Sequence, residues 1–113
     1  MTSVSGHTPS SGILAADRGS GEPPGVRRIA GQHFDVEFVR LGANDVLDRP
    51  KGPGAGEEVA AVLEGMWHVG CGDEEYWLSP GEGILIPPGE GSRWRSGDAG
   101  GLLYRVVVRV PIP

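Results

Sequence analysis

Short apolar runs separated by glycine, proline and acidic residues are the feature that most limits what this chain can fold into. Between residues 57 and 89 four such runs follow one another, and none is long enough for a stable helix. Each run ends at a turn signal, as strands do in antiparallel sheets. The runs are Val59 to Leu63, Met66 to Val69, Tyr76 to Leu78 and Ile84 to Ile86. We therefore interpret residues 57–89 as one β-meander.

Glycine and proline are abundant, but their placement favours an ordered domain. The chain of 113 residues contains 20 glycines and 10 prolines, and from residue 29 to residue 110 they lie between the apolar runs. An all-β protein with many tight turns needs them there. A chain of this length has room for one domain with one hydrophobic core. We expect a flexible tail over residues 1–25, which are rich in Ser, Gly, Thr and Pro, and a single domain over residues 26–113.

Alternating residues outside the meander predict further strands. The segment 26–30 is a candidate first strand, and residues 33–41 alternate between apolar and polar side chains. We expect Phe34, Val36 and Phe38 to face the core, and His33, Asp35 and Glu37 to face solvent. Residues 42–56 read as the longest loop. Two more alternating runs, 90–96 and 102–110, complete an all-β pattern with no helical periodicity, which is typical of a small barrel or jelly roll.

The charge of the chain favours a small soluble ligand over nucleic acid or membrane. The net charge is −5 and the pI is about 5.1, so phosphate backbones and anionic lipids are not attracted. No apolar run approaches the roughly 20 residues of a membrane span, and the N-terminus lacks the order of a secretory signal. Cys71 is the single cysteine and forms no intrachain disulfide. We expect a cytoplasmic protein.

Two segments carry a resemblance to a known family. The sequence EVAAVLEG, residues 58–65, resembles the end of the first cupin motif, in which a metal-binding glutamate opens a strand. The sequence GEGILIPPG, residues 81–89, resembles the start of the second motif. At this spacing the chain is similar to the small single-domain cupins, the RmlC-like jelly-roll family, over about residues 26–110. The resemblance implies a double-stranded β-helix and a homodimer formed through an edge strand or an apolar sheet face.

At the positions of that family's metal ligands, this chain departs from the family's pattern. Metal-binding cupins carry His-x-His three or four residues before the glutamate, and a further His three residues after Pro-x-Gly. Here residues 51–54 are Lys-Gly-Pro-Gly, and the later position is Ser92, so only Glu58 of the four implied ligands remains. One carboxylate and one hydroxyl do not hold a transition metal. We expect no metal and no cofactor, although a site rebuilt from His33 or His68 stays open.

The resemblance also directs a set of side chains at the barrel interior. Glu58 would share this interior with Ser92 and Trp94, which gives a mostly apolar pocket with few polar groups, as small-molecule sites have. Desolvation disfavours a charged carboxylate, which would suit a general acid or base. The alternative is that Glu58 pairs with an arginine, Arg40 or Arg105, or lies in water at the mouth. Trp94 has a second reading as plain core.

Two functions follow from these observations. The first is a metal-independent cupin barrel that binds a small organic molecule, as an isomerase, cyclase or lyase of sugar or secondary metabolism with Glu58 as its catalytic residue. The alternative is a non-catalytic binding or sensing module. The candidate ligand-binding residues are Ser92, Trp94, Arg40, His68 and Tyr104.

Overall fold

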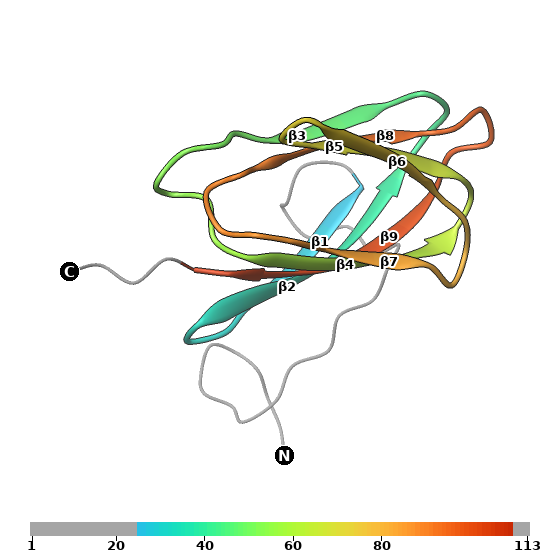
Figure 1. Cartoon of the computed structure of the whole chain (residues 1–113). Coiled ribbons are helices and arrows are strands. Elements are labelled where there is room, and N and C mark those ends of the chain that lie inside the picture. Colours follow the sequence, from blue (N-terminus) through green and yellow to red (C-terminus); the bar gives the residue numbers. More distant parts are fainter. Residues whose placement is uncertain (1–24, 110–113) are drawn as a thin grey trace, which may run out of the picture.

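Nine strands form two antiparallel sheets within residues 25–109, the part of the chain that the computed structural model describes (Figure 1). The five-stranded sheet has the order β1-β2-β9-β4-β7, and the four-stranded sheet, which lies above it in the figure, has the order β3-β8-β5-β6. The bounds are β1 Val26–Ala30, β2 Phe34–Leu41, β3 Val46–Arg49, β4 Glu58–Glu64, β5 Trp67–Cys71, β6 Glu74–Leu78, β7 Gly83–Ile86, β8 Ser92–Ser96 and β9 Gly101–Val108. The all-β jelly roll expected from the sequence is confirmed. The tail expected over residues 1–25 lies outside the described residues, apart from Gly25.

The meander expected over residues 57–89 is wrong, because its four strands divide between the two sheets. Strands β4 and β7 pair with each other in the five-stranded sheet, whereas β5 and β6 form a hairpin in the four-stranded sheet. At the corner between β4 and β5, Gly65 has a φ of 82° and lies against the backbone of Gly100. Any side chain at Gly65 would be strained, and its Cβ would lie 2.2 Å from the Gly100 carbonyl oxygen. The glycine therefore lets the chain pass from one sheet to the other.

The loop expected over residues 42–56 also contains a strand that the sequence did not predict. Strand β3 is four residues long and pairs with β8 at the edge of the four-stranded sheet. Its sequence, VLDR, is too short to show a period, so neighbouring prolines and glycines dominated the interpretation.

The two faces of β2 are the reverse of the expected ones. Glu37 is 5% exposed and Val39 is fully buried, whereas Phe34 is 44% exposed on the outer face of the sheet. The burial of Glu37 is possible because Arg105 Nη2 donates to its Oε1 at 2.7 Å and Arg28 Nε donates to its Oε2 at 3.1 Å. A carboxylate with two guanidinium partners can be buried where an unpaired one is excluded.

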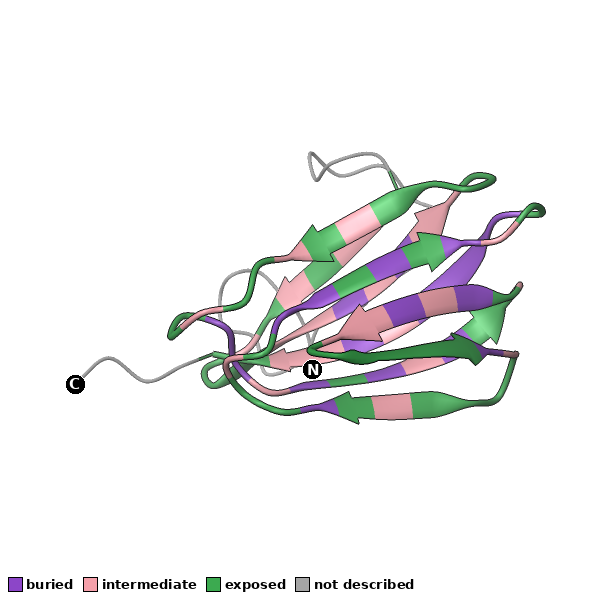
Figure 2. Cartoon of the chain, turned by 45° about the horizontal axis from the view of Figure 1, so that its top comes forward, coloured by how far each residue is buried: buried purple, intermediate pink, exposed green. Residues whose placement is uncertain are grey.

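The hydrophobic core lies between the sheets around two tryptophans. Trp67 and Trp94 are fully buried and meet edge to face, with ring centroids 6.2 Å apart. Trp67 Nε1 donates to the Glu64 carbonyl oxygen at 3.0 Å, so its polar edge is satisfied. Figure 2 shows buried residues alternating with exposed ones along several strands, as expected when one side of each sheet faces the core. Other core residues are Val39, Ala60, Val62, Val69, Leu78, Ile86 and Leu103.

Residues 25–109 contain no helix of the length and hydropathy needed to cross a lipid bilayer.

Candidate functional site

Glu58 lies in the interior between the two sheets and accepts four hydrogen bonds there. Ser92 Oγ and Arg49 Nε donate to its Oε1 at 2.8 and 3.0 Å. Trp94 Nε1 and Arg105 Nη1 donate to its Oε2 at 3.1 and 3.2 Å. The Glu58 side chain is 0% exposed. Both oxygens of this carboxylate are therefore fully occupied by donors from the protein itself.

The register of the strands explains why these groups meet. Glu58 opens β4 in the five-stranded sheet, and Arg49 is the direct partner of Ser92 in the opposite sheet. Because side chains alternate along a strand, Ser92 and Trp94 both point inward from β8. The Glu58 carboxylate thus bridges the two sheets.

The ion pairs continue beyond Glu58 through Arg105. Arg105 donates to both Glu58 and Glu37, and Glu37 also accepts from Arg28. Along this row positive and negative groups alternate, so each buried charge has an opposite charge at hydrogen-bond distance. We call this set the interior ion cluster, and its members are Arg28, Glu37, Arg49, Glu58 and Arg105. It fills the part of the barrel where the sequence predicted a ligand pocket.

The surroundings of Glu58 do not fit a transition metal. All four groups that face its carboxylate are hydrogen-bond donors, and two of them, Arg49 and Arg105, carry positive charge. A metal ion needs lone pairs from several ligands; the guanidinium and indole groups offer none, which leaves the Ser92 hydroxyl as the single other oxygen beside the carboxylate. Within residues 25–109 no three His, Cys, Asp or Glu side chains gather as metal ligands, and His33 and His68 do not rebuild a site.

The six predicted site residues occupy three different places. Glu58, Ser92 and Trp94 face the interior together, as expected, and the pairing of Glu58 with Arg105, weighed from the sequence, is present. Arg40 and Tyr104 project from the outer face of the five-stranded sheet.

On that outer face Arg40 Nη1 donates to Glu64 Oε1 at 3.0 Å, and the ring of Tyr104 packs on Phe38 with centroids 5.4 Å apart. His68 lies on the outer face of the four-stranded sheet, where its Nε2 is 3.0 Å from Glu75 Oε1. The three surface residues are thus separated from Glu58 by the sheets themselves.

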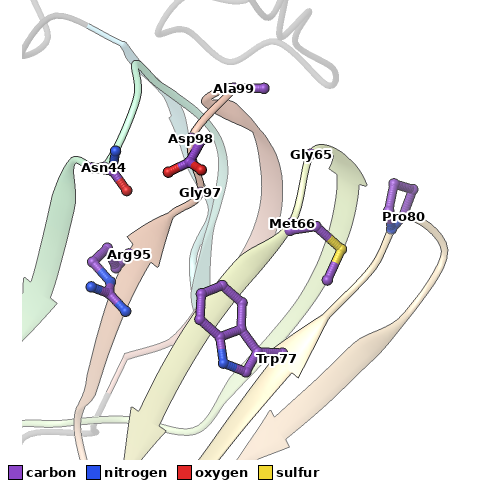
Figure 3. Close-up of a pocket in the computed structure, with 9 residues that line it drawn as sticks. All are labelled: Asn44, Gly65, Met66, Trp77, Pro80, Arg95, Gly97, Asp98 and Ala99. Carbon is purple, nitrogen blue, oxygen red and sulfur yellow. The ribbon is translucent and has the colours of Figure 1, made fainter.

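A cavity lined by residues within 25–109 lies outside the barrel, at one end of the four-stranded sheet (Figure 3). Its volume is about 760 Å³, within the range of small-molecule sites. Trp77 and Met66 line it and are 55% and 45% exposed, which is unusual for side chains of this size. We call it the outer cavity, and its lining residues are Asn44, Gly65, Met66, Trp77, Pro80, Arg95, Gly97, Asp98 and Ala99.

A row of paired residues forms the floor beside this cavity. Arg95 is the direct neighbour of His68 on β5, and His68 is the direct neighbour of Trp77 on β6. The His68 ring meets the Trp77 ring edge on at 5.1 Å, and the Arg95 guanidinium carbon lies 5.7 Å from the Trp77 ring centroid. A smaller cavity of about 270 Å³ shares Arg95 and includes His68. Trp77 is therefore held in place by neighbours on two strands.

The sequence reasoning missed the outer cavity. None of its lining residues is among the six predicted site residues; Arg95 lies on the face of β8 opposite Trp94, and Trp77 lies on β6. The signal that would connect them is the register of β8 with β5 and of β5 with β6, which a single sequence does not contain.

Cys71 is not activated as a nucleophile. Burial, followed by the negative charges of Glu90, Glu74 and Glu58, raises the pKa of the Cys71 thiol above its usual 9.0. A raised pKa keeps the thiol protonated, and the thiolate is the reactive form.

Comparison with known proteins identifies the fold. No protein-family model matches the sequence, and no curated protein matches it either. Among solved structures, KdgF from Halomonas sp. is 16% identical, with a TM-score of 0.66 over 81% of this chain and 86% of that one.

Two further solved structures are described as cupins. An RmlC-like cupin from Shewanella frigidimarina is 16% identical, with a TM-score of 0.65 over 86% of this chain and 94% of that one. The cupin domain of Schizosaccharomyces pombe Cnp3 is 14% identical, with a TM-score of 0.62 over 75% of this chain and 61% of that one. With two short antiparallel sheets enclosing a single core, the chain has the fold of the small RmlC-like cupins.

Proposed function

We propose that this protein is a non-catalytic cupin that binds a small organic molecule in the outer cavity. The observation that carries the proposal is the exposed side chain of Trp77 in a cavity of about 760 Å³. An exposed indole offers a flat apolar surface on which another ring can stack. Met66 and Pro80 extend this apolar surface on the side away from Arg95 (Figure 3).

The interior of the barrel supports the same choice. A substrate of an isomerase, cyclase or lyase that used Glu58 would have to reach a carboxylate that is 0% exposed and already accepts four hydrogen bonds. It would also have to displace Arg49 or Arg105 from Glu58, and breaking a buried ion pair in this way costs about 3–5 kcal/mol. Binding in the outer cavity requires neither step.

The test is an NMR titration with indole as the probe. The described residues contain three indole N–H groups, those of Trp67, Trp77 and Trp94, and a Trp77→Phe variant assigns the Trp77 signal. We expect indole to shift the Trp77 N–H signal and to leave the signals of the two buried tryptophans unchanged. A shift confined to Trp94 would favour ligand binding beside Glu58 instead, and the absence of any shift would refute the proposed site.

We also propose that two copies pair through the outer face of the five-stranded sheet. The register places an apolar residue on each of its five strands in one continuous row, which consists of Ile29, Val36, Val106, Val59 and Leu85. Val59 and Leu85 are 48% and 56% exposed. Large exposed apolar patches are uncommon on monomers, and a twofold axis lets such a patch cover its own copy. A homodimer would bury this row.

A further inference from the structure

We infer that the ligand of the outer cavity is a zwitterion with a flat apolar side chain, of the class of the aromatic α-amino acids. The inference rests on the proposed function and specifies which charges the ligand carries. It is drawn from two lining residues of opposite charge, Arg95 and Asp98, that stand on one side of the same apolar cavity (Figure 3).

Neither of these charges is neutralised by an ion pair within residues 25–109. The Arg95 guanidinium carbon lies 5.7 Å from the Trp77 ring centroid, a cation–π contact that leaves its N–H donors without a hydrogen-bond acceptor, and the Asp98 carboxylate accepts no hydrogen bond from the described residues. Other polar side chains on this face are paired: Arg93 Nη1 lies 3.1 Å from Asp48 Oδ2, and His68 Nε2 lies 3.0 Å from Glu75 Oε1. Arg95 and Asp98 thus differ from their neighbours in having their hydrogen-bonding groups available.

The arrangement matches the distribution of charge in an α-amino acid. A guanidinium presents parallel N–H donors to a carboxylate, and a carboxylate accepts from an ammonium group. In a zwitterion these two groups share one carbon, so a single molecule can bridge Arg95 and Asp98 while its side chain extends over Trp77. A ligand with only an anionic group would be attracted by Arg95 and repelled by Asp98. A ligand with only an ammonium group would be attracted by Asp98 and repelled by Arg95.

The apolar part of the cavity selects for a ring. Trp77 is fixed by the edge contact of His68 at 5.1 Å, so little conformational entropy is lost when a ligand stacks on it. Met66 adapts its shape and contacts aromatic rings favourably through its sulfur. An aromatic side chain therefore fits this surface better than a polar one.

Three probes that share one ring separate the charges. L-Phenylalanine carries both charges, 3-phenylpropionate only the carboxylate, and 2-phenylethylamine only the ammonium group. Binding is followed by the Trp77 N–H signal at low salt, because screening weakens exposed charge pairs. We expect phenylalanine to bind tightest. Arg95→Gln should lower the affinity for phenylalanine and phenylpropionate by about three- to tenfold and leave the affinity for phenylethylamine unchanged. Asp98→Asn should lower the affinity for phenylalanine and phenylethylamine and leave that for phenylpropionate unchanged.

Matched variants control for nonspecific effects of charge. Arg93→Gln removes a charge from the same face of the same strand but outside the outer cavity, and Asp73→Asn removes one from the turn between β5 and β6. Both should change the affinity for phenylalanine by less than about twofold, since exposed charges at a distance are largely screened.

The outcomes distinguish this inference from the proposed function. If phenylalanine binds no tighter than both other probes, or if the Arg95 and Asp98 variants affect the three probes equally, the zwitterion inference is refuted, while a shift of the Trp77 signal by indole still supports the site. If neither indole nor any of the three probes shifts that signal, both proposals are refuted.

Discussion

Replacing Glu58 with glutamine keeps the size of the side chain but removes the negative charge that two buried arginines share. The amide offers one acceptor oxygen, while its NH₂ group would face donors that have lost their partner. With either orientation of the amide, one guanidinium would point at N–H hydrogens. Trp94 Nε1 would do so as well in one orientation, whereas in the other the Ser92 hydroxyl can turn and accept from the amide. Arg105 and Arg49 are only 6% and 17% exposed, so water does not readily replace the lost bonds.

The size of the effect follows from this burial. Breaking a buried, hydrogen-bonded ion pair costs about 3–5 kcal/mol, which is a large part of the roughly 5–15 kcal/mol that stabilises a domain. At about 4 °C per kcal/mol for a domain of this size, Tm should fall by about 12–20 °C. Urea unfolding followed by circular dichroism would give the same loss in free energy of unfolding.

Glu64→Gln is the matched control for this prediction. Glu64 pairs with Arg40, but the two side chains are 57% and 37% exposed, so the change should be within about 1 kcal/mol. If Glu58→Gln lowers the free energy of unfolding no more than Glu64→Gln does, the interior ion cluster does not stabilise the fold. Glu58 would then have no structural role in the interior.

Three further predictions concern other parts of the fold. Gly65→Ala should lower the free energy of unfolding in urea by about 1–3 kcal/mol because of its positive φ. Gly70→Ala should lower it by no more than about 1 kcal/mol, since the added Cβ would lie 4.0 Å from the nearest neighbouring atom. The rate of Cys71 alkylation by iodoacetamide, which follows the thiolate fraction, should have its inflection above pH 9.0, the usual pKa of the thiol, and an inflection below that pH would contradict the role of burial. Leu85→Glu should convert a dimer to a monomer in light scattering coupled to size exclusion, and an unchanged mass would refute the proposed sheet interface.

Much of the fold could be predicted where the local residue pattern is compatible with only one secondary structure. The alternation of Ser92 and Trp94 against their neighbours put both on one face, the resemblance to the cupins directed that face inward, and the turn glycines and prolines marked where strands end. The strand expected at residues 26–30 is confirmed as β1. These features depend on short-range geometry, which consecutive residues determine.

The errors arose where long-range partners decide the outcome. Polar residues on β2 were expected to face solvent, but Arg105, 68 positions away along the chain, makes the interior favourable for Glu37. Glu58 was expected inside and lies there, but its bonds to Ser92 and Trp94 span 34 and 36 positions, so its hydrogen-bond partners likewise depend on long-range contacts. Periodicity alone treats every charged side chain as solvent-seeking.

The sequence by itself determined that the chain is all-β, where most of its turns fall, that Glu58 stands without the histidines of a metal site, and that Glu58 shares a face with Ala60 and Val62. The tertiary structure alone decided that arginines surround this carboxylate, and that Trp77, Arg95 and Asp98 line one cavity on the outer side of the barrel. The physical reason is that a strand's period fixes which side each residue faces, whereas the pairing of distant strands fixes what it meets there.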